Sequence, residues 1–123
     1  MIWIGSWRNQ YGSILRITDD ANQRIAGTFT TALADSGFFG DAVPVVGVHQ
    51  GDCVSFTFAR TGPGGDTICS FTGLLREGKL QTLWHVLTDS ALRAKRAGAP
   101  ATIEKLGWAH AAHTNADTFE RIE

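Results

Sequence analysis

Short runs of Thr, Phe, Val, Ile and Trp recur along this chain, and glycine-rich turns separate them. The 14 glycines punctuate the runs at roughly the 8–12-residue spacing that is typical of β-sandwiches and β-barrels. We expect the runs to form eight strands, at residues 4–9, 13–18, 24–33, 43–49, 53–61, 66–75, 80–88 and 113–122.

Apolar and polar residues alternate within these runs, most clearly in segment 53–61. Val54, Phe56 and Phe58 share one face of the predicted strand, and Arg60 continues that face at the strand's end. A strand with this pattern buries one face and exposes the other. Turn sequences such as QGD at 50–52 and REG at 76–78 connect consecutive runs, so neighbouring strands are expected to form hairpins.

An even number of hairpin-connected strands favours a closed barrel, because closure removes the exposed edges that an open sheet must protect. We therefore predict an all-β fold, an eight-stranded antiparallel up-and-down β-barrel. A barrel of eight strands is just wide enough to hold one small ligand.

Segment 90–107 departs from the strand pattern. It is rich in Ala, Leu, Lys and Arg, which are good helix formers, and Gly98-Ala99-Pro100 interrupts it. The composition predicts one or two short helices, a helical insertion before the last strand. A lid or an oligomer contact is a natural role for such an insertion.

The size and charge of the chain limit its partners. With 123 residues and 13.3 kDa, the chain is expected to be a single domain, residues 1–123. Its formal charge of −1 gives no electrostatic footprint for nucleic acid and no basic patch for a membrane surface. The first residues lack the features of a signal peptide, so the compartment stays open between the cytoplasm and a secreted mature form.

The two cysteines are predicted to be free thiols. Counting back from the turn at 61–65, Cys69 pairs near Phe58, several positions from Cys53. Alternation turns Cys69 inward with Phe71 and turns Cys53 outward. A disulfide needs Cα atoms within about 7 Å, which this register does not provide.

Five fragments, in order, resemble the avidin and streptavidin family. They are GSWRNQYGS at 5–13, AGTFTTA at 26–32, FTG at 71–73, QTLW at 81–84 and DTF at 117–119. The resemblance implies the same eight-stranded barrel, biotin or a biotin-like molecule bound inside it without catalysis, and a homo-oligomer, a dimer or a tetramer. The apolar residues Leu74, Leu83 and Leu87 on the predicted outer face agree with a sheet that packs against another barrel.

The same resemblance assigns roles to individual residues. Asn9 and Ser13 would face the ureido oxygen, and Thr31 and Asp117 would accept hydrogen bonds from the two ureido nitrogens. A urea needs this arrangement, since it offers one acceptor oxygen and two N–H donors in one plane. The predicted contacts around the rest of the ligand are the apolar wall of Trp84 and Phe71 and, at its carboxylate tail, the hydroxyl of Thr67.

Three residues depart from the family pattern, and a fourth has an uncertain register. Phe29 stands where the family usually has a tyrosine, Arg60 where it has a wall tryptophan, and Cys69 where it has a threonine. Trp108 is the candidate for the tryptophan that a neighbouring subunit contributes. Loss of the tyrosine hydroxyl removes about 1.5–3 kcal/mol of hydrogen bonding, so weakened biotin binding or another small ligand is expected.

Other interpretations of the same residues stay open. Asn9 and Ser13 flank a turn, where such side chains often bond their own backbone. The aromatic residues also suit a plain core, and Thr31 and Thr67 suit any strand. A barrel enzyme that acts on an acidic or polar metabolite through Arg60 and Asp117, or an interaction module with a filled interior, are the alternatives. We expect no cofactor and no metal, because the HxxH at 110–113 lacks further ligands with metal-site spacing.

Overall fold

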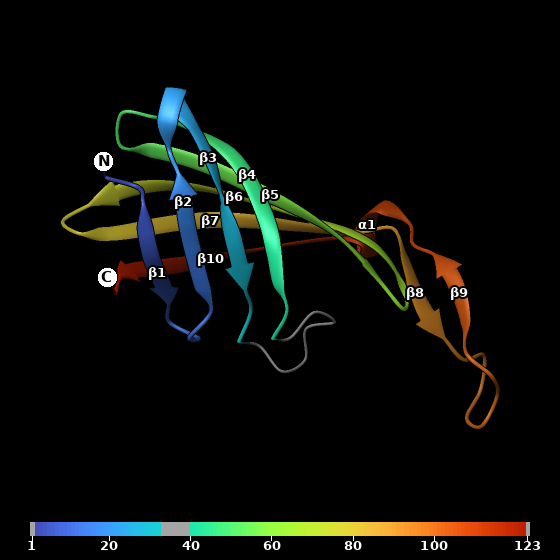
Figure 1. Cartoon of the computed structure of the whole chain (residues 1–123). Helices are drawn as coiled ribbons and strands as arrows, with labels where there is room; N and C mark the ends of the chain where they lie inside the picture. Colours follow the sequence, from blue (N-terminus) through green and yellow to red (C-terminus); the bar gives the residue numbers. More distant parts are fainter. Residues whose placement is uncertain (1, 33–39, 123) are drawn as a thin grey trace.

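The computed structural model describes residues 2–32 and 40–122. Its main element is a closed antiparallel barrel with the strand order β1-β10-β7-β6-β5-β4-β3-β2, which confirms the predicted eight-stranded up-and-down barrel (Figure 1). The barrel strands are β1 (Gly5–Asn9), β2 (Ile14–Asp19), β3 (Arg24–Thr30), β4 (Ala42–Gln50), β5 (Cys53–Gly62), β6 (Gly65–Arg76), β7 (Lys79–Thr88) and β10 (Ala112–Arg121).

The predicted strands agree with these bounds to within a residue or two, except for segment 24–33. Its strand β3 ends at Thr30, and residue 33 lies outside the described residues. A 3-10 helix, η1 (Ala21–Gln23), connects β2 to β3. Gly27 and Gly47 let neighbouring strands approach closely, because an added Cβ would lie 1.9 Å from the Arg16 carbonyl oxygen and 1.8 Å from that of Ser55.

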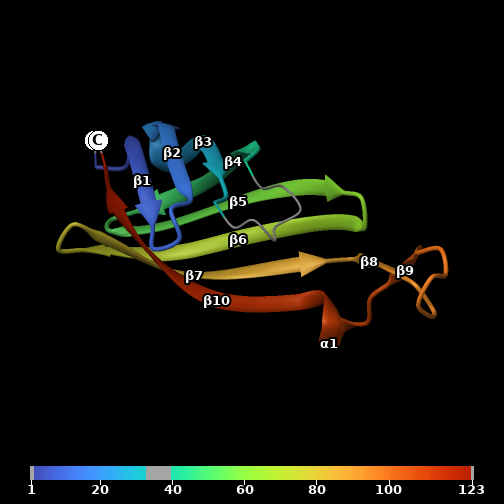
Figure 2. The same ribbon diagram turned by 90° about the horizontal axis from the view of Figure 1, so that it is seen from below.

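The barrel strands differ in length, and this difference shapes the molecule. Strands β5, β6, β7 and β10 have 10, 12, 10 and 10 residues, whereas β1, β2 and β3 have 5, 6 and 7. The four long strands therefore continue past the short ones as a twisted ribbon, seen from below in Figure 2.

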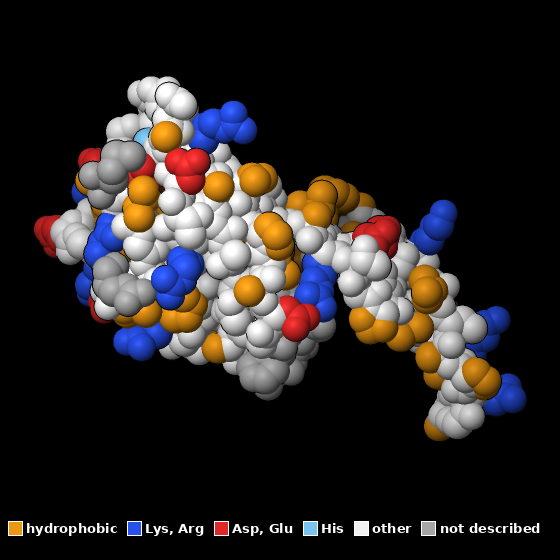
Figure 3. All heavy atoms as spheres, in the orientation of Figure 1, with side chains coloured by type: hydrophobic (Ala, Val, Ile, Leu, Met, Phe, Trp, Pro, Cys, Tyr) orange, Lys and Arg blue, Asp and Glu red, His pale blue; other side chains and the backbone are white. Residues whose placement is uncertain are grey.

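Segment 90–107 is not helical, so that prediction is wrong. It forms a two-stranded hairpin of β8 (Ser90–Arg93) and β9 (Thr102–Lys105). We call residues 90–105 the arm; Figure 3 shows it standing clear of the barrel. A short helix does precede the last strand, as expected, but it is α1 (Trp108–Ala111), which lies after the arm.

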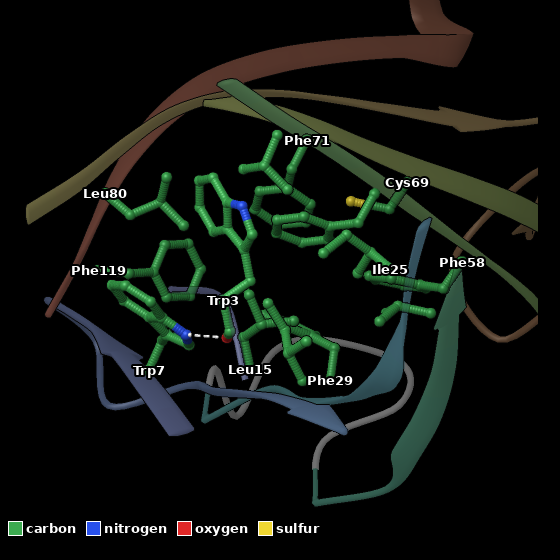
Figure 4. Packing of buried hydrophobic residues seen from close by; sticks show 14 of the residues in the cluster. Trp3, Trp7, Leu15, Ile25, Phe29, Phe58, Cys69, Phe71, Leu80 and Phe119 are labelled. Carbon is green, nitrogen blue, oxygen red and sulfur yellow. Dashed lines mark hydrogen bonds between the residues drawn. The ribbon is translucent and has the colours of Figure 1, made fainter. Parts of the chain in front are cut away.

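One end of the barrel is closed by aromatic packing. Trp3 lies just before β1 and is 1% exposed, and its carbonyl oxygen accepts a 3.0 Å hydrogen bond from Trp7 Nε1. Figure 4 shows its ring inside the barrel among Leu15, Phe71 and Phe119. Because Asn9 ends the strand that Trp3 precedes, the polar residues discussed below lie away from the end that Trp3 closes.

The cysteine predictions are confirmed. Both thiols are free, with Cys53 exposed and Cys69 buried. Cys69 pairs with Phe58, whereas Cys53 pairs with Leu74.

Candidate functional site

Four buried polar residues come together where the short strands β1, β2 and β3 begin or end, away from Trp3. Asn9 ends β1, Ser13 precedes β2, Thr31 follows β3, and Asp117 lies in β10. None is more than 7% exposed. Chain segments more than a hundred residues apart therefore meet here, because β1 pairs with β10 as the barrel closes.

Hydrogen bonds link these residues in pairs. Asn9 Nδ2 donates to Asp117 Oδ2 at 3.1 Å, and Ser13 Oγ donates to Thr31 Oγ1 at 3.5 Å. Asn9 Oδ1 accepts the backbone N–H groups of Tyr11 and Ser13, so the Asn9 side chain bonds its own turn through its oxygen and Asp117 through its nitrogen. An asparagine has two amide N–H donors, and only one of them is needed for the bond to Asp117.

Aromatic rings form the wall beside this polar cluster. Phe29 stacks on Phe58 with 5.4 Å between ring centroids, and Phe71 lies 5.6 Å from Phe29 and 6.5 Å from Trp84. Trp84 Nε1 is buried and has no acceptor among residues 2–32 and 40–122. A buried donor without a partner is unusual in folded proteins and leaves an N–H for a ligand.

Cys69 belongs to the same wall, opposite Phe58. Burial, and to a smaller extent the negative charge of Asp117, raises the pKa of its thiol to about 12. The thiol is therefore neutral and unreactive near neutral pH. It serves as a small, polarisable wall residue rather than a nucleophile.

The mouth of the barrel carries the remaining polar residues on the inner face. Thr67 Oγ1 lies 3.1 Å from Thr88 Oγ1, and Arg60 pairs directly with Thr67 across β5 and β6. Arg60 Nη2 forms an ion pair with Asp41 Oδ2 at 2.7 Å. The site thus has a polar inner end, an aromatic middle and a charged mouth.

Comparison with known proteins identifies the family of this barrel. The family model of the Avidin family matches residues 2–99. The chain belongs to the avidin family. No curated protein matches the chain, but solved structures do. Core-bradavidin is 29% identical with a TM-score of 0.70, covering 94% of this chain and 96% of that one.

Two further structures share the avidin-family fold at lower identity. Apo shwanavidin is 21% identical with a TM-score of 0.76, covering 100% of this chain and 98% of that one. The bradavidin2–biotin complex is 18% identical with a TM-score of 0.70, covering 97% of this chain and 96% of that one. Bradavidin2 is thus a protein of this fold with biotin bound.

Trp108 lies near the mouth residues Arg60 and Thr67 of this avidin-family barrel, but not among the buried polar residues. It begins α1 and is 77% exposed. Together with Arg60, Thr67 and Thr88 at the mouth, it lines a cleft of about 630 Å³, whose other walls include Ala59, Ile68 and Leu87. Alternation puts these last three residues on the outer face of the sheet, opposite to Phe58 and Cys69. Trp108 therefore does not line the interior of its own barrel.

Several residues in contact with the site were not identified from the sequence. Gln10 Nε2 donates to Asp117 Oδ1 at 3.2 Å, and Thr82 Oγ1 donates to the Asp117 carbonyl at 3.0 Å. Thr82 and Thr88 lie on the same face of β7 as Trp84, so the alternation of the sequence could have predicted that both point inward. Gln10 and Asp41 lie in connections, where no periodic pattern tells which way a side chain points.

The structure also bears on metals and membranes. Within the described ranges, no three His, Cys, Asp or Glu side chains are grouped so that they could hold a metal ion. In those same ranges no helix has the length and apolar character needed to cross a bilayer.

Proposed function

We propose that this chain is a non-catalytic binding protein that holds biotin, or a biotin-like urea, inside its barrel. The observation that carries the proposal is the convergence of Asn9, Ser13, Thr31 and Asp117 in one buried cluster. Buried polar groups cost about 1–3 kcal/mol each when they lack partners, so such a cluster suits a polar ligand. Structures of bradavidin2 and rhizavidin, which share the fold, are biotin complexes.

The cluster has the donors and acceptors that a urea requires. The unused N–H of Asn9 is placed to donate to the ureido oxygen. The hydroxyl of Ser13 would join it by turning its one proton away from Thr31 Oγ1, which lies 3.5 Å away. Thr31 and Asp117 are placed to accept from the ureido nitrogens, because an ionised carboxylate has about four acceptor positions and Asp117 uses two, for Asn9 and Gln10.

The wall residues support an apolar ring next to the urea. Phe71 and Trp84 supply aromatic surface, and Cys69 fills the space beside them as a neutral thiol. Phe29 has no hydroxyl to donate, so we expect weaker binding than a site with three donors would give. The loss corresponds to about 1.5–3 kcal/mol, or roughly 10- to 150-fold in Kd.

Titration calorimetry and thermal melting with biotin test this proposal. Wild-type protein is expected to gain about 4 kcal/mol of stability at a biotin concentration 1,000 times the Kd. Thr31→Val removes the buried hydroxyl at constant shape and is expected to weaken binding roughly 5- to 150-fold. Thr102→Val, at an exposed position of β9 in the arm, is the matched control and leaves the Kd unchanged. Absence of biotin binding by the wild type, or equal effects of the two variants, contradicts the proposal.

The proposal includes a homo-oligomer, formed through the outer face of β6 and β7. Ile68, Leu74, Leu83 and Leu87 are 53%, 39%, 62% and 41% exposed on this face. Apolar residues gathered on one face indicate an interaction surface. In such an assembly Trp108, which lies beside Leu87 at the outer cleft, would approach the neighbouring subunit.

Native mass spectrometry and light scattering test the oligomer. Leu83→Glu places a charge in the centre of this face and is expected to shift the mass to that of a monomer. Leu92→Glu, at a 48% exposed position on the arm, is the control and keeps the wild-type mass. A monomeric wild type at micromolar concentration contradicts this part of the proposal.

A further inference from the structure

A row of polar side chains crosses three neighbouring strands at the mouth of the barrel. Arg60 of β5 pairs with Thr67 of β6, and Thr67 pairs with Thr88 of β7. The contact between the two threonine hydroxyls uses one hydroxyl proton, so the other proton remains for an acceptor. A guanidinium beside a hydroxyl donor suits a carboxylate, because arginine presents paired N–H groups that match its two oxygens.

Asp41 occupies part of this donor set in the protein without ligand. Its Oδ2 lies 2.7 Å from Arg60 Nη2. Asp41 comes directly before β4, next to Gly40, whose N–H donates to the Thr31 carbonyl at 3.3 Å. The backbones of β4 and β5 are paired from Gln50–Cys53 to Val46–Thr57. Asp41 and Arg60 lie beyond Val46–Thr57, so their ion pair links the two chain segments where the backbone pairing has ended.

The two partners of this ion pair differ in their access to water. The side chain of Arg60 is 25% exposed, whereas that of Asp41 is 57% exposed. Asp41 can leave the pair and be solvated at little cost, since ion pairs this open contribute about 0.2–1 kcal/mol. A largely buried guanidinium, in contrast, is costly to leave without an anion. Any exchange is therefore expected to replace Asp41 and to keep Arg60 in place.

We propose that Arg60 receives the carboxylate of an acidic ligand, and that Asp41 holds this position until the ligand replaces it. The inference rests on the proposed function, because it concerns the outer part of the same site. It makes the site selective for ligands with a free carboxylate over their neutral amides.

The test compares the Kd values of biotin and biotinamide, which differ only in the carboxylate, by titration calorimetry. Wild-type protein is expected to bind biotin at least several-fold more tightly than biotinamide. Asp41→Asn removes the competing charge and is expected to tighten biotin binding up to about 5-fold, with little effect on biotinamide. Arg60→Gln is expected to abolish the preference between the two molecules.

Asp52→Asn is the matched control. Asp52 forms an equally short ion pair, 2.7 Å from Arg76, with both side chains exposed, and its loss is expected to leave both Kd values unchanged. Thermal melting of each variant without ligand verifies that it is folded.

The outcomes separate this inference from the proposed function. One outcome is that wild type binds biotin and biotinamide with equal Kd values, and that Asp41→Asn changes neither Kd or changes both by the same factor. In that case Arg60 is not the carboxylate receptor, although the barrel still binds the urea. If wild type binds neither molecule, the proposed function fails and this inference fails with it. Retained preference for biotin in a folded Arg60→Gln variant also overturns it.

Discussion

The contact between Asp117 and two amide side chains leads to a sharp prediction for Asp117→Asn. In the wild type, one carboxylate oxygen accepts from Asn9 Nδ2 at 3.1 Å and the other from Gln10 Nε2 at 3.2 Å. An asparagine at position 117 has only one acceptor oxygen, and its second terminal atom is an NH₂ donor. One of the two amide donors must then face another donor.

The magnitude follows from which contact is lost. A hydrogen bond to a charged group contributes about 1.5–3 kcal/mol. The new NH₂ is expected to turn toward Gln10, which is exposed, because water can satisfy both donors there. The loss should therefore be near the lower value, about 1.5 kcal/mol, which for a domain of this size lowers Tm by roughly 5–7 °C.

A double-mutant cycle with Gln10→Ala tests the assignment. Urea unfolding of the wild type, the two single variants and the double variant gives the coupling free energy. We expect the double variant to be more stable than the sum of single effects predicts, by at least about 0.5 kcal/mol, because removal of Gln10 removes the opposed donor. An Asp117→Asn variant as stable as wild type, or an additive cycle, would refute this reasoning.

Three further predictions follow from the site and the arm. Phe29→Tyr buries a hydroxyl beside Phe58, so calorimetry without biotin should show a variant less stable than wild type by about 1–3 kcal/mol. Biotin should then stabilise the variant more than it stabilises the wild type. Equal stabilisation of the two proteins by biotin would contradict the role of position 29. Replacing residues 91–104 by an Asn-Gly turn should change Tm by less than about 3 °C, since Leu92 and Ile103 are 48% and 62% exposed. A larger decrease of Tm in scanning calorimetry would show that the arm packs against the barrel. Folding raises the pKa of the Cys69 thiol from its ordinary 9.0 to about 12, so its contribution to stability is complete below pH 9 and declines as the pH rises toward 12. The difference in unfolding free energy between wild type and Cys69→Ala should therefore shrink between pH 9 and pH 11, and a constant difference in urea titrations would refute the shift.

Alternation and turn counting were sufficient to predict the inner surface of the long strands. They turned Arg60, Cys69 and Phe71 inward and put Cys69 opposite Phe58, as the register shows. The prediction was correct because side chains in a strand alternate between the two faces of the sheet, so assigning one residue to a face fixes the face of every other residue in that strand. The contacts of Gln10 and Asp41 could not be predicted in this way, because both residues lie outside the strands and their partners are fixed only by barrel closure.

The arm shows how tertiary contacts override local propensity. Its composition favours helix, but Gly98 and Pro100 divide it into pieces shorter than the about 12 residues that a helix needs without packing. Asp89 also joins the two ends of the arm: its carbonyl accepts the Leu106 N–H at 2.9 Å, and its N–H donates to the Asp66 carbonyl at 3.0 Å. With both ends held side by side, an antiparallel pair satisfies the backbone of the segment where two short helices would not.

Charge along the barrel axis gives the proposed ligand only one favourable orientation. Asp117 places a negative charge among buried residues, and Arg60 places a positive charge at the mouth. A carboxylate seated at about 4 Å from Asp117 would be repelled by about 4 kcal/mol at an effective dielectric constant of 20. The same group beside the partly exposed Arg60 would instead be attracted, by about 0.2–1 kcal/mol. Under this proposal the interior is expected to accept a neutral head with N–H donors and to reject an acidic one, while the mouth is expected to prefer an acidic tail. A single molecule with both groups, such as biotin, satisfies the two ends only when its urea enters first.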